Sequence, residues 1–107
     1  VRYGSAMVRS RAFGYIEQFA KPDQPTTRVE NTDSARMIIE QGGGIGALFC
    51  FVGDACATIE RVFPEPFDQM ECWVLYHESA RGSAKVRAVL DALVPYLRGR
   101  HAVLSGT

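Results

Sequence analysis

NTDSARMIIEQGGGIGALFCFV, residues 31–52, decides the expected fold, because it joins a helical pattern to an apolar run through a cluster of glycines. Apolar side chains at helical spacing predict a buried stripe made of Ala35, Ile38 and Ile39. The glycines at 42–44 follow the last helical positions and predict a helix stop. The run 45–52 has no polar alternation, which is typical of a parallel strand covered on both faces.

The order of these elements argues against a dinucleotide or phosphate site. Such a site needs a strand, then glycines, then the start of a helix, so that free amides point at the phosphates. Here the glycines at 42–44 follow a helix, and Gly46 lies inside the expected strand. We therefore interpret the glycine cluster as a helix stop with a tight return.

The N-terminal third of the chain predicts a βαβ unit. Residues 1–7 suggest a short strand that ends in a turn at Gly4 and Ser5, and residues 10–19 a helix capped by Ser10. The β-branched stretch 26–30 suggests a second short strand before the helix of residues 31–41. This alternation predicts an α/β fold with a mainly parallel sheet, right-handed crossovers and flanking helices.

The C-terminal third has a different pattern. Pro64 and Pro66 favour an extended connection, which we interpret as a boundary. Residues 72–76 predict an apolar strand, and a helix capped by Ser83 should place five apolar side chains on one face: Val86, Val89, Leu90, Leu93 and Leu97. Pro95 is expected to end or kink that helix, and residues 99–107 to form a frayed tail.

Composition narrows the classes of function. The 107 residues suffice for one domain, and 12 Lys plus Arg balance 12 Asp plus Glu, so direct nucleic-acid binding by these residues is disfavoured. Three cysteines cannot all pair within the chain, which favours the reducing cytoplasm. No apolar run is long enough to span a membrane. Because the chain begins with Val1 rather than methionine, we expect it to be part of a longer polypeptide.

Catalytic and metal-binding groups are not apparent in the sequence. His77 and His101 lie far apart and have no carboxylate or cysteine partner at helical spacing. Cys50 and Cys56 do not match a zinc-site spacing. We expect no enzymatic activity, no cofactor and no metal, and we expect Cys50 and Cys72 to be buried free thiols.

Three segments at helix starts or a strand end are candidates for ligand binding. A helix N-terminus at Asn31–Asp33 offers free amides and a favourable dipole, although capping alone also explains these residues. In open α/β sheets, ligands gather where strands end and helices begin. The predicted ligand-binding residues are Gly4, Ser5, Ala6, Asn31, Thr32 and Phe49.

Four stretches together carry a resemblance to a known family: residues 30–51, 59–66, 70–77 and 85–93. They resemble the C-terminal part of the effector-binding region of LysR-type transcriptional regulators, over about residues 1–97. The most specific element is the helix followed by Gly44-Ile45-Gly46-Ala47-Leu48-Phe49-Cys50. Many relatives have proline after the leucine, where this chain has Phe49.

This resemblance implies part of a two-lobed fold like that of periplasmic binding proteins, with a small effector between the lobes. Residues 1–63 would form most of the second lobe and residues 64–68 the crossover linker. Residues 69–98 would be the strand and helix that return to the first lobe, and residues 99–107 the tail. DNA binding would belong to a winged helix-turn-helix that is absent from this chain, within a cytoplasmic homo-oligomer.

Two other functions remain open. A solute-binding receptor of a transport system has the same two-lobed fold, and a small α/β enzyme is the third possibility. The strand 72–76 and its helix lack a sheet to cover under the resemblance. We therefore expect them to pack on another part of the polypeptide, on a second copy of the chain, or back on residues 1–63.

Overall fold

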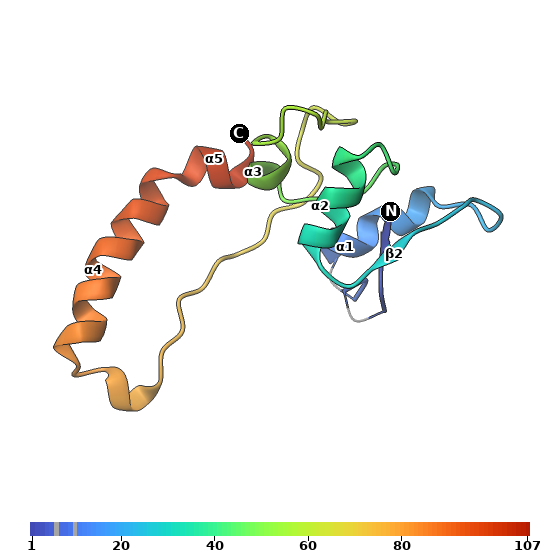
Figure 1. Cartoon of the computed structure of the whole chain (residues 1–107). Coiled ribbons are helices and arrows are strands. Elements are labelled where there is room, and N and C mark those ends of the chain that lie inside the picture. The colour runs from blue at the N-terminus through green and yellow to red at the C-terminus, as the bar shows by residue number, and fades with distance from the viewer. Residues whose placement is uncertain (6, 10) are drawn as a thin grey trace.

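The computed structural model describes residues 1–5, 7–9 and 11–107, and it is elongated (Figure 1). Its radius of gyration is 17.1 Å, whereas a compact domain of this length would have about 13 Å. Residues 1–67 form a body, and residues 68–100 form an arm that leaves the body and comes back to it. The body combines helices with a small parallel sheet, so an α/β composition is confirmed at this coarse level.

The sheet consists of β1 (Arg2–Tyr3) and β2 (Arg28–Val29), which run parallel with Arg2 opposite Arg28. The expected helix between them is divided into α1 (Arg11–Gly14) and the 3-10 helix η1 (Tyr15–Phe19). Its predicted cap, Ser10, lies outside the described residues. The Arg2 guanidinium forms an ion pair with Glu17, which ties η1 to β1 and holds the pKa of that carboxyl below its usual value.

The helix predicted from the glycine stretch is present as α2 (Thr32–Glu40). Gly42 has a φ of +76°, and the amides of Gly42 and Gly43 donate to the carbonyls of Ile39 and Ile38. This is the Schellman pattern, which satisfies the last carbonyls of a helix. The prediction of a glycine helix stop is therefore confirmed.

The core is small and lies between the sheet, α1 and α2. Its buried side chains are Tyr3, Phe13, Val29, Ala35 and Ala47, with Ile38 and Leu48 packed at its edge. Tyr3 is fully buried, and its ring meets the Phe13 ring edge-on at 5.0 Å. Ala35 is also fully buried, as the helical stripe predicted.

The prediction of a strand at residues 45–52 is wrong. Residues 43–49 form no ladder, and α3 (Cys50–Gly53) begins where the strand should continue. The segment does lie beside β1, where two hydrogen bonds hold it. The Val1 nitrogen donates to the Ile45 carbonyl at 2.6 Å, and the Tyr3 hydroxyl donates to the Ala47 carbonyl at 2.6 Å. These two hydrogen bonds hold the segment where a backbone ladder was expected.

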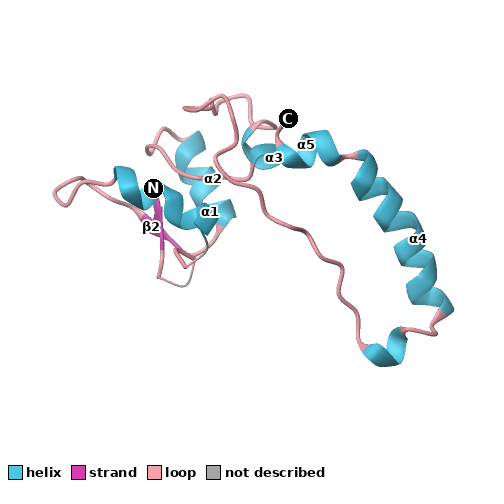
Figure 2. Ribbon diagram, turned by 180° about the vertical axis from the view of Figure 1, so that it is seen from behind, coloured by secondary structure: helices cyan, strands magenta, loops and turns pink. Residues whose placement is uncertain are grey.

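The arm also departs from the sequence prediction. Residues 69–77 have no strand partner among the described residues, and they lead through the 3-10 helix η2 (Glu78–Ala80) into α4 (Ala84–Gly99) (Figure 2). Ser83 caps α4 as predicted, since its hydroxyl accepts from the Val86 amide. Pro95 does not end the helix, which continues to Gly99, because the bond lost at a proline is only one of a long series.

The prediction of a frayed tail at residues 99–107 is wrong as well. Residues His101–Ser105 form α5, which contacts α3, and a second glycine stop follows at Gly106, whose φ is +76°. The chain end therefore packs on the body. Of the three expected outcomes for residues 72–76, a return onto residues 1–63 is not seen: Trp73 is 73% exposed and Leu75 is 87% exposed.

Candidate functional site

The ends of β1 and β2 bring two of the predicted ligand-binding residues together. The Gly4 amide donates to the Val29 carbonyl at 2.8 Å, and Asn31 follows two residues later. The Asn31 side-chain oxygen accepts from the Ser34 amide at 2.8 Å, so it caps α2. Gly4 and Asn31 therefore both lie at the carboxyl edge of the parallel pair, where ligands gather in open α/β sheets.

Glu30 changes the chemistry of this strand edge. Its carboxylate occupies the place that a Cβ at position 4 would take, so a side chain there would require the flexible Glu30 side chain to move. A carboxylate here repels an anion, which offsets the attraction of the α2 N-terminus. Ser5 is exposed and Thr32 is half-buried, whereas Ala6 lies outside the described residues. Their role in binding stays a prediction.

Phe49, the sixth predicted ligand-binding residue, lies elsewhere. Its ring packs edge-on against Phe13 at 5.3 Å and lies nearly parallel to Phe51 at 5.5 Å. Phe13 in turn contacts Tyr3, so a row of aromatic rings leads from the core towards the surface. Phe49 thus connects the core to the cleft described next.

The body contains a cleft of about 500 Å³. Its walls are η1, residues 44–50 and the loop 58–67. Aromatic rings dominate them: Tyr15 stacks on Phe67 at 4.2 Å, and Phe19 lies 5.9 Å from Phe63. This volume lies within the usual range of small-molecule sites, which are mostly apolar with few polar groups.

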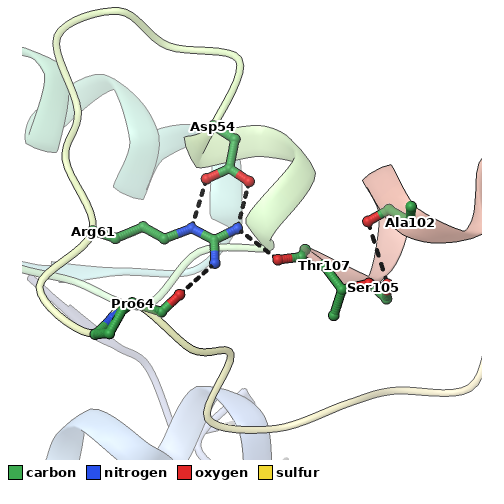
Figure 3. Close-up of polar contacts among 7 residues, drawn as sticks. Asp54, Arg61, Pro64, Ala102, Ser105 and Thr107 are labelled. Atoms are coloured by element: carbon green, nitrogen blue, oxygen red, sulfur yellow. Dashed lines mark hydrogen bonds and ion pairs between the residues drawn. The ribbon is translucent and has the colours of Figure 1, made fainter.

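The polar lining of the cleft includes the ion pair between Asp54 and Arg61 (Figure 3), together with Thr58, Glu60 and Glu65. Arg61 donates from Nε and Nη2 to the two Asp54 oxygens at 2.8 and 2.5 Å, from Nη1 to the Pro64 carbonyl at 2.9 Å, and from Nη2 to the Gly106 carbonyl at 3.1 Å. The Arg61 hydrogen bond lowers the pKa of Asp54. This guanidinium is already committed to protein acceptors, so the geometry favours an uncharged ligand over an anion.

Sequence reasoning missed this cleft apart from Phe49. Asp54 and Arg61 are seven residues apart in irregular backbone, and no helical or strand period relates them. The one available signal was the density of aromatic residues in 49–67, where Phe49, Phe51, Phe63 and Phe67 occur. Three of these rings, Phe49, Phe63 and Phe67, line the cleft, because the loop 58–67 returns to η1.

The cysteines and His77 differ in their exposure and in their contacts. Cys72 is exposed, so the prediction that its thiol is buried was wrong. The reason is that other described residues do not cover the segment around it. Cys50 is half-buried. Glu40, beside the Cys56 thiol, raises the pKa of that thiol. His77 Nδ1 accepts from the Ser79 amide at the start of η2. Within residues 1–5, 7–9 and 11–107, no three His, Cys, Asp or Glu side chains are placed to hold a metal ion.

The helices in the described part of the chain do not include one with the length and apolarity needed to cross a membrane. Comparison with known proteins adds no relationship: no protein-family model, curated protein or solved structure matches the chain.

Proposed function

We propose that this chain is a non-catalytic, small-molecule-sensing part of a cytoplasmic LysR-type transcriptional regulator. The observation that carries the proposal is the aromatic cleft, because two of the stretches with the family resemblance form its walls. Residues 44–50 form one wall and residues 59–66 much of another. Two of the four stretches that gave the resemblance thus meet around one ligand-sized cleft.

The ligand that fits this cleft is an uncharged, flat and largely apolar molecule. Stacked rings offer it apolar faces, and Arg61 offers no free positive charge. The cleft is lined by residues between 15 and 67, which belong to the second lobe and the linker. In the intact regulator, an effector bound there would favour one arrangement of that lobe and the linker and shift the population towards it. DNA would be contacted only by a winged helix-turn-helix outside residues 1–107. The two-lobed arrangement and the domain boundaries at 63, 68 and 98 belong to this proposal.

The binding step is tested with 1-naphthol as the probe, titrated into the 107-residue chain and followed by backbone amide chemical shifts. We expect saturable shifts confined to η1, residues 44–50 and residues 58–67, which form the walls of the cleft. Phe63→Ala should weaken binding about tenfold, the equivalent of about 1.4 kcal/mol. Met37→Ala is the matched control, because Met37 is 59% exposed on α2 and does not line the cleft. Shifts spread over the arm, or equal effects of the two substitutions, would contradict the cleft assignment.

The predicted strand-edge residues are tested in the same titration. If Gly4, Ser5, Asn31 and Thr32 contribute to the site, Ser5→Ala and Thr32→Val should each weaken binding. Unchanged affinity in both variants would make them structural positions. The regulator assignment itself depends on the coding sequence upstream of Val1: a winged helix-turn-helix supports it, and a signal peptide would contradict it in favour of a solute receptor.

A further inference from the structure

Gly106, which ends α5, packs closely against the first residue of α3. Its φ of +76° is a left-handed conformation that glycine adopts at little cost. A Cβ at position 106 would lie 2.5 Å from the Cys50 Cβ and 2.6 Å from the Cys50 Sγ, which is closer than such atoms approach one another in proteins. The Cys50 Cβ cannot turn away, because the backbone of α3 fixes its position. Glycine at position 106 therefore lets α5 dock on α3 in this way.

Two residues of this docking contact also line the cleft. They are Cys50 and Arg61, whereas Gly106 itself is not among the lining residues. The Arg61 guanidinium donates from Nη1 to the Pro64 carbonyl, in the loop that forms one wall, and from Nη2 to the Gly106 carbonyl. Asp54, at the end of α3, accepts from the same guanidinium (Figure 3). One side chain thus joins a wall of the cleft, α3 and the end of α5.

The rigid geometry of the guanidinium links these hydrogen bonds. A planar fork keeps its bonds to Pro64 and Gly106 together only in one position, so movement of either carbonyl disturbs the bond to the other. Each bond is charge-assisted, which strengthens it relative to a neutral hydrogen bond. A ligand that holds the loop 58–67 against η1 keeps the Pro64 carbonyl in place, and with it the donor that α5 uses. Release of α5 removes this constraint on the loop.

The helix α5 is suited to be released, because little else stabilises it. It has five residues, whereas isolated helices shorter than about 12–15 residues are marginal in water. Val103 is 55% and Leu104 is 40% exposed, so the helix buries little apolar surface. Segments with few buried contacts are the first to open locally. The docked position of α5 thus depends largely on its contacts with α3 and Arg61.

We propose that occupancy of the cleft and docking of α5 are coupled: a ligand bound in the cleft strengthens docking, and release of α5 weakens ligand binding. In the docked state Arg61 bridges the loop 58–67 and α5, and in the released state the loop loses that brace. A ligand shifts the balance because it binds the braced loop more tightly. Thermodynamic linkage requires the two effects to be equal.

The coupling gives the cleft an output elsewhere in the chain. Only Arg100 separates α5 from α4, so docking of α5 also positions the end of α4. The ligand belongs to the proposed function, on which this inference rests. The contact between α5 and the wall of the cleft does not depend on the ligand, so it can be tested separately.

Gly106→Ala tests the coupling without changing a residue that lines the cleft. Its methyl group would meet Cys50, and alanine is strained in the left-handed conformation, so α5 should be released. 1-Naphthol is titrated into the 107-residue chain and followed by amide chemical shifts. We expect Gly106→Ala to weaken binding about fivefold, at the lower end of typical coupling. Gly99→Ala is the matched control and should bind like the wild type, because the space around Gly99 is open.

Amide hydrogen exchange supplies the reciprocal measurement. In the wild type, saturating 1-naphthol should slow exchange in α5 about fivefold and leave residues 84–91 of α4 unchanged. Without the probe, Gly106→Ala should speed exchange of the Ile59 amide, which lies in the cleft wall and donates to the Cys56 carbonyl. Gly99→Ala should leave Ile59 exchange unchanged. Equal protection of α2 in the wild type and both variants will show that the body stays folded.

Failure of the coupling and failure of the proposed function give different results. If 1-naphthol does not bind the wild type, the proposed function fails, and Ile59 exchange alone decides whether α5 braces the cleft wall. Unchanged Ile59 exchange in Gly106→Ala would overturn the coupling. So would equal affinity of the two glycine variants for the probe, or α5 exchange that the bound probe does not alter. Loss of α2 protection in Gly106→Ala would overturn it too, because α5 would then hold the whole body rather than one wall.

Discussion

The buried Tyr3 hydroxyl should make this protein sensitive to alkali in a way that a single substitution removes. Tyr3 is fully buried, and its hydroxyl donates to the Ala47 carbonyl at 2.6 Å. Burial raises the pKa of Tyr3 to about 12, from an ordinary value of 10.0. The Tyr3→Phe variant keeps the ring and removes both the hydrogen bond and the titration.

The sign of the effect follows from which state holds the proton more tightly. The folded state keeps the Tyr3 proton up to a pKa of about 12, whereas the unfolded chain releases it near 10. The stabilisation is therefore complete below about pH 10 and is lost as the pH rises through 12. One pKa unit corresponds to about 1.4 kcal/mol, so the loss is about 1.4 kcal/mol at pH 11 and approaches about 2.7 kcal/mol well above pH 12.

Urea unfolding of the wild type and of Tyr3→Phe, at about pH 8 and about pH 11, measures this effect. At pH 8 the variant should be less stable by about 1–3 kcal/mol, because the Ala47 carbonyl loses its partner. At pH 11 the difference between the two proteins should narrow by about 1.4 kcal/mol. Tyr76→Phe, at a half-exposed tyrosine, is the control and should show no narrowing. A constant difference between wild type and Tyr3→Phe at both pH values would refute the reasoning.

Two further substitutions test the chain's folding devices. Gly42→Ala should reduce the free energy of unfolding, measured with urea, by about 1–2 kcal/mol. The reason is that Gly42 has a φ of +76°, where a residue with a side chain is strained. Gly53→Ala is the control and should be neutral or slightly stabilising, because there is open space around Gly53. Arg61→Met removes the hydrogen bond to the Gly106 carbonyl, so it should speed amide hydrogen exchange in α5 with little change in α2. Arg98→Met, at an exposed arginine, is the control and should leave the exchange rates of both helices unchanged. Equal protection of α5 in the two arginine variants would show that Arg61 does not hold the chain end.

Local devices were predictable from the sequence. The Asn31 cap, the Ser83 cap and the glycine stop after α2 each depend on a few adjacent residues, and each is confirmed. The parallel pairing of the first two short strands was also predicted, since a helical segment between two short strands favours it. The side-chain chemistry of each device satisfies backbone groups within one turn, so no distant partner is needed.

Longer-range arrangements were decided only by the tertiary structure. An apolar run becomes a strand only when a neighbouring backbone supplies a ladder, and residues 45–52 meet instead the Val1 amine and the Tyr3 hydroxyl. The same requirement explains why residues 72–76 stay unpaired, and why burial of Cys72 was predicted wrongly. The aromatic cleft joins Tyr15 to Phe67, 52 residues apart, and Arg61 contacts Gly106, 45 residues away; such juxtapositions leave no periodic trace in the sequence. The sequence by itself determined caps, stops and helical faces, because their partners lie a few residues away. Only the fold decided which apolar segments found partners, because those partners come from distant parts of the chain.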